Sequence, residues 1–225
     1  MKAGKALTRS ALKKFPLPPV VDGGKETKGR ILIIAGCREL AGAGLLGARS
    51  AMRAGAGKLR MITVEAVAIG TSLAMPEAMV LGLEEAHDGG YTGKAIRPIG
   101  KEADRSDVVV AGPGMANSAS CGQLAEILLQ SEAAVVLDAA LLHSLEPIAA
   151  EKRRGPTPIL LPHAGELASL LECNESEVES DPVGYGLRAA ELHQAIVLVK
   201  GVTSHVVTPE AQAWTYKGGA PGLGV

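Results

Sequence analysis

Short apolar runs recur along this chain, and each one ends at glycine, proline or a chemically active side chain. The runs are rich in Val, Ile and Leu, so they predict strands that are buried on both faces of a sheet. Longer amphipathic stretches separate them, and strands that alternate with helices favour a mostly parallel sheet. The runs are 31–35 before Gly36, 107–111 before Gly112, 134–137 before Asp138, 159–161 before Pro162 and 196–199 before Lys200.

The pattern predicts an α/β fold in which helices cover a mostly parallel sheet that finishes in an antiparallel C-terminal edge. Residues 65–105 follow a less regular pattern, and 205–216 is expected to form two antiparallel strands joined at Pro209. The first 28 residues predict a short helix and an extended arm, because the prolines that follow Phe15 stop a helix. Residues 29–225 are then expected to form one domain. A further strand is predicted at 59–64, and helices at 44–54, 120–130, 165–171 and 184–194.

Composition narrows the class of partner. The chain has 225 residues, a net charge of −1 and only 2% aromatic residues, so neither nucleic acid nor a membrane surface is expected as a partner. It holds no run of about 18 apolar residues. The three cysteines are widely spaced and form no C-x-x-C pair, so free thiols in a reducing compartment are expected. These features predict a cytoplasmic protein.

The residue pattern of a dinucleotide-binding fingerprint is present, but its position relative to the preceding strand is wrong. Residues 42–47 match G-x-G-x-x-G, and Glu65 follows at a suitable distance. The fingerprint needs its glycines directly after the strand, because the tight turn and the helix N-terminus form one unit. Here residues 37–41 intervene after Gly36. A chance match in a chain rich in Gly and Ala is the better interpretation.

The residues after the strands are the candidates for a ligand site, because open α/β sheets bind ligands beyond the carboxyl ends of their strands. The turn at 112–114 can hold an anion through backbone N–H groups, or can be a plain turn. Asp138 can cap the next turn or help to order a cation and its phosphates. Lys200 after a strand suits an anion, because an unpaired ammonium group is costly there.

His163 and Glu166 lie three residues apart at a strand end, so both can face one site as a helix begins. A glutamate in a first helical turn also interacts favourably with the helix dipole, which is the structural alternative. The Gly-rich stretch 217–225 is either a flexible tail or the beginning of an anion-binding loop.

Seven motifs taken in order point to a family. They are GAGLLGARSAMRAGAG, PEAM, DVVVAGPG, VVLDA, LLPHAGELASLL, VLVKGVTSHVV and GGAPG. From about Gly29 to Val225 the chain resembles the ribokinase-like NAD(P)H-hydrate dehydratases. The resemblance implies a three-layer fold and repair of hydrated NADH or NADPH, with ADP or ATP as phosphoryl donor and Mg²⁺. In this family a phosphate is transferred to the ring hydroxyl and then eliminated. The resemblance also implies a homotetramer.

The resemblance assigns residues by motif position. It implies that Ala43, Gly114 and His163 contact the hydrate. It implies that Asp138 and Glu166 order the magnesium ion and phosphates. The nucleotide contacts that it implies are Lys200, Gly201, Val202, Thr203 and Ser204.

Three motifs depart from the family pattern. The second acid of D-A-D is Ala140, the residues after Gly114 are Met115-Ala116 where Leu-Gly is usual, and G-N-P-G reads as 219–222 with alanine for asparagine. The family's G-x-G-D segment and its catalytic aspartate would lie beyond Val225, so no catalytic residue is assigned and the 225 residues alone are expected to be inactive. A thiazole- or pyridoxal-type kinase of the same superfamily, or a catalytically silent nucleotide-binding member, is the alternative.

Overall fold

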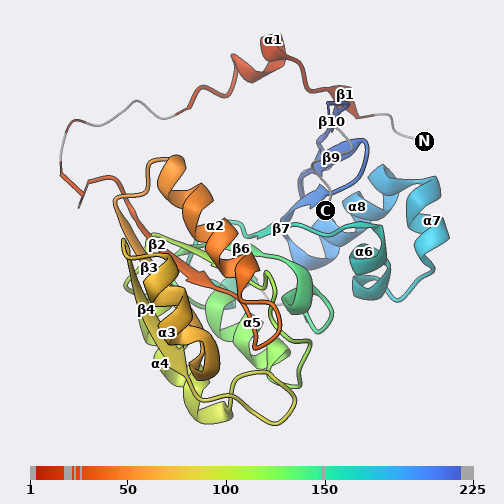
Figure 1. Cartoon of the computed structure of the whole chain (residues 1–225). Helices are drawn as coiled ribbons and strands as arrows, with labels where there is room; N and C mark the ends of the chain where they lie inside the picture. The colour runs from red at the N-terminus through yellow and green to blue at the C-terminus, as the bar shows by residue number, and fades with distance from the viewer. Residues whose placement is uncertain (1–3, 18–21, 23, 26, 148–149, 219–225) are drawn as a thin grey trace. The chain divides into compact units, whose positions relative to one another are not determined.

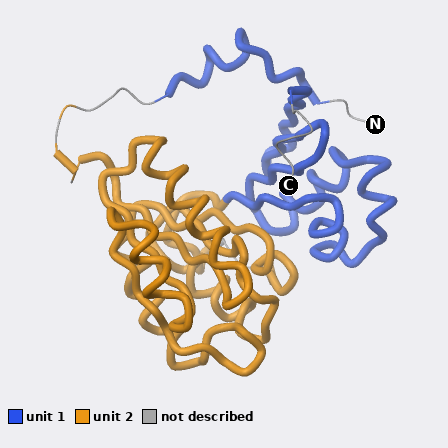
Figure 2. The backbone as a smooth tube through the Cα atoms, viewed as in Figure 1, with its two compact units in different colours: residues 1–20, 159–225 blue, residues 21–158 orange. Residues whose placement is uncertain are grey.

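The computed structural model describes residues 4–17, 22, 24–25, 27–147 and 150–218. The chain divides into two compact units, residues 21–158 and residues 1–20 with 159–225 (Figure 2). Each unit contains its own strands and helices. The single domain at 29–225 and the arm boundary at residue 28 stay predictions.

The larger unit holds a parallel sheet whose described strands run in the order β6-β5-β2-β3-β4. The register pairs Leu32 of the central strand with Val109 on one side and Arg60 on the other. Because the strands are parallel, their carboxyl ends meet at one edge of this sheet. The strands are β2 (Arg30–Ile34), β3 (Lys58–Val64), β4 (Ala78–Leu83), β5 (Val108–Ala111) and β6 (Ala134–Leu137).

Helices cover both faces of this sheet (Figure 1). Ile33 packs in a buried cluster with Ala48 of α2, so Leu32 and Ile34 face the opposite side of the sheet. α4 lies on that second side, because its Glu102 lines a small hollow together with Leu32, and α5 packs against α4. The helices are α2 (Gly42–Arg53), α3 (Glu65–Ala74), α4 (Gly93–Ala103) and α5 (Cys121–Leu129), with 3-10 turns η1 (Ala139–Leu142) and η2 (Ala150–Lys152).

The region that sequence left irregular, 65–105, contains α3, β4 and α4. Local composition hides these elements. Two apolar residues of α3, Ile69 and Leu73, are each 79% exposed. The spacing of apolar residues in α3 therefore does not indicate which face of the helix is buried. β4 carries Gly82, and α4 carries Pro98 in its interior, which is a strong helix-breaking signal in a sequence. Packing overrides these local preferences.

The smaller unit combines β7 (Ile159–Leu160), β8 (Ile196–Val199), β9 (Ser204–Val207) and β10 (Ala213–Tyr216) with α6 (Ala164–Leu170), α7 (Glu175–Ser180) and α8 (Pro182–His193). β7 and β8 are parallel, and β8, β9 and β10 are antiparallel, which confirms the predicted C-terminal edge. Gly186 lets α8 approach the sheet closely, because a Cβ there would lie 2.9 Å from Val199 and 3.2 Å from Val207.

The N-terminal segment contains one short helix and a two-residue strand. The helix α1 spans only Arg9–Leu12 and is capped by Thr8, whose hydroxyl accepts from the N–H of Ala11. Before it, the strand β1 (Lys5–Ala6) pairs in parallel with β10, and Phe15 makes an edge-on ring contact with Trp214. Residues 18–21 of the predicted arm lie outside the described residues.

The three cysteines carry free thiols, as the sequence predicted. Cys37 and Cys121 are buried thiols, Cys173 is half-buried, and all three are free. Among the described residues, no helix combines the length and apolar character that a membrane crossing requires.

His193, at the end of α8, is 4% exposed and its Nε2 atom has no hydrogen-bond partner among the described residues. Burial lowers the pKa of His193 from 6.5 to about 4. Between these two values the unfolded chain binds a proton that the folded chain does not. Stability from this group is therefore fully present above about pH 7 and is lost as the pH falls toward 4.

We expect the free energy of unfolding to fall by about 2 kcal/mol more between pH 7.5 and pH 5 in the wild type than in His193→Leu. Urea denaturation at the two pH values measures this difference. His87→Leu, which removes an exposed histidine, is the matched control and should keep the wild-type profile. Equal pH profiles for the wild type and His193→Leu would contradict a buried neutral imidazole.

Candidate functional site

In the larger unit, the residues after β2, β5 and β6 lie at the same edge of the sheet. Gly36 follows β2 with a φ of 82°, and its N–H donates to the carbonyl oxygen of Pro113 at 2.9 Å. Thus the turn after β2 and the turn after β5 are directly joined.

Gly112 allows the chain after β5 to approach the chain after β6. Its φ is 116°, and a Cβ placed on it would overlap the carbonyl oxygen of Asp138. The N–H of Asp138 donates to the carbonyl oxygen of Ala111 at 3.0 Å, which extends the β5–β6 ladder by one residue. Asp138 is then the N-cap of η1, and Ala139 adopts a left-handed conformation with a φ of 47°. Only glycine fits at position 112.

Ala43 and Gly114, both predicted as hydrate contacts, lie against each other. Gly114 has a φ of 65°, and a Cβ on it would be 2.6 Å from the Cβ of Ala43 and 2.7 Å from the carbonyl oxygen of Leu40. The structure therefore brings the first turn of α2 against the turn at 112–114. A ligand at this place would meet backbone and small side chains, so it could approach the chain closely.

Two residues at this edge were not singled out by sequence. Thr63, near the end of β3, is 1% exposed, its hydroxyl has no partner among the described residues, and it lies beside Gly36. Asp88 accepts hydrogen bonds from the N–H groups of Ala119 and Gly90 at 3.0 and 3.1 Å. The N–H of Ala119, followed by that of Gly90, lowers the pKa of Asp88. Asp88 thus holds the loop after β5 through Ala119. In the sequence, only the Asp-Gly-Gly turn at 88–90 could have indicated this contact.

In the smaller unit, His163 and Glu166 form a capping box at the N-terminus of α6. The Nδ1 atom of His163 accepts from the N–H of Gly165 at 3.0 Å, and a Glu166 carboxylate oxygen accepts from the N–H of His163 at 2.8 Å. Two otherwise unpaired N–H groups at the helix start are satisfied in this way. Glu166 therefore does stabilise the start of a helix, which was the structural alternative for this motif.

The same carboxylate also faces Lys200. The Nζ atom of Lys200 lies 3.6 Å from Oε2 of Glu166, and Nε2 of His163 lies 3.4 Å from Oε1. The main chain of Lys200 is fixed as well, because its N–H donates to the carbonyl oxygen of Pro162 at 2.8 Å. The structure thus brings together three of the predicted site residues. Their side chains differ in exposure, with Glu166 at 8%, Lys200 at 38% and His163 at 57%.

The loop after Lys200 joins β8 to β9 and presents its residues to solvent. Val202 is 96% exposed, whereas Thr203 is half-buried. The hydroxyl of Ser204 donates to the carbonyl oxygen of Gly201 at 3.4 Å, which closes the loop. A fully exposed apolar side chain beside Lys200 would gain by contact with an apolar part of a ligand.

The described residues contain no group of three or more His, Cys, Asp and Glu side chains that could hold a metal ion. Asp138 and Glu166 therefore do not belong to a protein-built metal cage of that kind.

Comparison with known proteins adds the family. The family model described as NAD(P)H-hydrate dehydratase matches residues 31–225. The chain belongs to this family. The ADP-dependent (S)-NAD(P)H-hydrate dehydratase of Xanthomonas campestris is 38% identical over 224 residues, which cover 98% of this chain and 74% of that protein. The bifunctional NAD(P)H-hydrate repair enzyme of Thermofilum pendens is 31% identical, and the match covers 92% of this chain and 40% of that protein.

Solved structures agree with the assignment. The ADP/ATP-dependent NAD(P)H-hydrate dehydratase of Bacillus subtilis, crystallised with ATP and Mg²⁺, matches with a TM-score of 0.80 and 26% identity, over 100% of this chain and 76% of that one. A ribokinase-like superfamily protein of Enterococcus faecalis matches with a TM-score of 0.76 at 20% identity, over 99% and 74% of the two chains. The predicted ribokinase-like fold is confirmed.

The close approach of Gly112 to Asp138 gives a prediction for stability. Gly112→Ala should lower the free energy of unfolding by about 3 kcal/mol, because overpacking costs roughly 1–3 kcal/mol and a left-handed alanine roughly 1–2 kcal/mol. Gly42→Ala is the matched control, since nothing lies within 4 Å of a Cβ at this first residue of α2. It should change stability by less than about 1 kcal/mol. Urea denaturation compares the two, and equal midpoints would contradict the described turn.

Proposed function

We propose that this chain carries out the ADP- or ATP-dependent dehydration of (S)-NAD(P)H hydrate to NAD(P)H. The likeness to the Xanthomonas campestris enzyme over 98% of the chain carries the proposal. The candidate residues support it, because those in each unit gather at strand ends, where ligands of α/β sheets bind.

The hydrate is proposed to contact Ala43 and Gly114, with His163 as a further contact. The first two offer backbone and one methyl group, so a flat ring can come close to the main chain there. His163 offers an imidazole that is 57% exposed even though its Nδ1 atom caps α6. Because this imidazole caps the helix, it is held in one orientation, which suits a side chain that must position a ligand.

The nucleotide is proposed to contact residues 200–204. The ammonium group of Lys200 is accessible to a phosphate, and the exposed side chain of Val202 offers apolar contact. Phosphoryl transfer depends mainly on positioning and on cationic stabilisation of the phosphate oxygens. The buried carboxylate of Glu166 holds the ammonium group of Lys200 in place, while the side chain of Lys200 remains partly exposed to solvent.

Asp138 and Glu166 are proposed to help order Mg²⁺ and its phosphates through water. When bound, Mg²⁺ would neutralise negative charge on the transferring phosphate. The residues themselves bind water molecules and set their orientation. Assembly as a homotetramer and a cytoplasmic location remain predictions.

Activity is tested with the purified protein. Purified NADH hydrate with Mg²⁺ and ADP or ATP should regain absorbance at about 340 nm, the band of the reduced nicotinamide ring, because dehydration restores the dihydropyridine chromophore. Omission of the nucleotide is the control and should abolish the recovery. Phosphorylation of hydroxyethylthiazole or pyridoxal without any recovery of NADH would contradict the proposal and favour the kinase alternative.

Binding is tested separately, with the 225-residue chain. Lys200→Ala should weaken ADP or ATP binding by about 1–3 kcal/mol in calorimetry, the typical contribution of a charge-assisted hydrogen bond. Lys13→Ala removes an exposed lysine elsewhere and is the matched control. Thermal unfolding of both variants checks that the loss of the Glu166 ion pair has not unfolded the smaller unit. Unchanged affinity in folded Lys200→Ala would remove Lys200 from the nucleotide site.

A further inference from the structure

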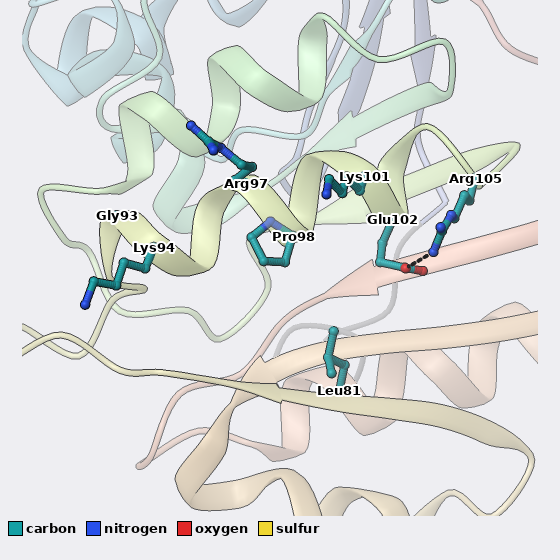
Figure 3. Close-up of a pocket in the computed structure, with 8 residues that line it drawn as sticks. All are labelled: Leu81, Gly93, Lys94, Arg97, Pro98, Lys101, Glu102 and Arg105. Atoms are coloured by element: carbon teal, nitrogen blue, oxygen red, sulfur yellow. Dashed lines mark hydrogen bonds and ion pairs between the residues drawn. The ribbon is translucent and has the colours of Figure 1, made fainter.

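A basic groove of about 640 Å³ opens between α4 and β4 in the larger unit. We refer to it as the α4 groove. Four cationic side chains and a single carboxylate line it, with Leu81 across from them on β4 (Figure 3). None of the residues assigned to hydrate, nucleotide or magnesium belongs to its lining. The lining is Leu81, Gly93, Lys94, Arg97, Pro98, Lys101, Glu102 and Arg105.

The cations are spaced to share one face of α4. Lys94, Arg97 and Lys101 follow one another within α4 at intervals of three and four residues, the spacing of a single helical stripe, and Arg105 follows the helix end at Ala103. The opposite side of the helix is buried through Ile96, Ile99 and Ala103. Because that side is packed into the core of the unit, the stripe is fixed on the wall of the groove.

This charge arrangement does not help the helix to form. Arg97 and Lys101 are four residues apart within α4, and like charges at that spacing destabilise a helix. Lys94 lies in the first turn, where the helix dipole disfavours a cation. The stripe therefore opposes local stability, which is expected where side chains serve a ligand.

Within the described part of the chain, only one of the four cations is neutralised. Arg105 forms an ion pair with Glu102 at 2.8 Å, and the same carboxylate also accepts a hydrogen bond from Arg60 of β3. No carboxylate among the described residues pairs with Lys94, Arg97 or Lys101, and all three are exposed. The groove thus carries an excess of positive charge with donors available for an anion.

The groove also offers apolar surface. The ring of Pro98 lies between the cations of α4, and the side chain of Leu81 lies across from them on β4 (Figure 3). A smaller hollow has Leu81 and Glu102 in common with the groove, and Met79 of β4 and Leu32 of β2 also line it. A volume of about 640 Å³ falls within the range of pockets that bind small molecules.

We propose that the α4 groove binds a phosphorylated small molecule of nucleotide size. Its phosphates contact Lys94, Arg97 and Lys101, and its apolar part lies on Leu81 and Pro98. Arginine binds phosphate through paired N–H donors and lysine through a point charge, so the stripe matches a chain of phosphates. This site is independent of the proposed nucleotide contacts at 200–204.

The test follows amide hydrogen exchange of residues 93–105 by mass spectrometry, so that binding at residues 200–204 is read from a different segment. The 225-residue chain is titrated with tripolyphosphate, with ATP and with adenosine in about 50 mM salt, where screening is modest. Tripolyphosphate and ATP should slow exchange in 93–105. ATP should half-saturate at the lower concentration, because it adds apolar contact, and adenosine alone should have no effect.

Paired variants assign the effect to the stripe. Arg97→Ala with Lys101→Ala should raise the half-saturating ATP concentration by about tenfold or more, as expected for lost charge-assisted contacts. Arg49→Ala with Arg53→Ala removes the same charge from exposed positions on α2, so its effect should stay below about twofold. The first pair should melt at or above the wild-type temperature, because it removes like-charge repulsion.

Three results would overturn the proposal. One is the absence of slower exchange in 93–105 with either phosphate compound. Another is an equal loss of binding in the two double variants, which would mean attraction by net charge alone. The third is ATP binding no tighter than tripolyphosphate, which would exclude a role for Leu81 and Pro98 and hence a nucleotide-sized ligand.

Discussion

The carboxylate of Glu166 is the group on which the arrangement of the smaller unit's candidate residues depends. It accepts the N–H of His163, lies beside the imidazole of that residue and faces the ammonium group of Lys200. A carboxylate with so little exposure needs such partners, because an unpaired buried charge is strongly unfavourable. Loss of Glu166 would therefore remove a helix cap and its ion pair with Lys200 at the same time.

In the larger unit, the candidate residues come close together because glycines leave out the side chains that would separate them. Gly112 lies where any Cβ would overlap the backbone of Asp138, and Gly114 lies where a Cβ would press on Ala43. Both adopt positive φ angles. Backbone and methyl groups thus form the surface at the ends of β5 and β2, and polar contacts come from N–H and C=O groups. Such a surface is rigid, since it has no side-chain rotamers to order when a ligand binds.

Sequence reasoning succeeded where a residue's role follows from its place after a strand. The runs at 31–35 and 196–199 predicted β2 and β8, and parallel pairing then places Gly36 and Lys200 at strand ends. It failed for α4, because Pro98 contradicts a helix locally and only the burial of Ile96 and Ile99 explains the helix. Thr63 was missed because a threonine inside a strand looks like ordinary β-sheet composition. The units 1–20 with 159–225 and 21–158 were also not visible in composition.

The ion pair between Lys200 and Glu166 changes what a nucleotide would experience at this loop. Sequence reasoning gave Lys200 an external anion as its partner, but Glu166 already lies 3.6 Å from its Nζ atom. A phosphate that binds Lys200, as proposed, would bring negative charge toward a buried carboxylate, and like charges in a poorly solvated site repel strongly. A divalent cation beside the phosphates would offset that repulsion. On the proposed function, Mg²⁺ bound to the phosphates would supply that positive charge with only one or two protein carboxylates nearby.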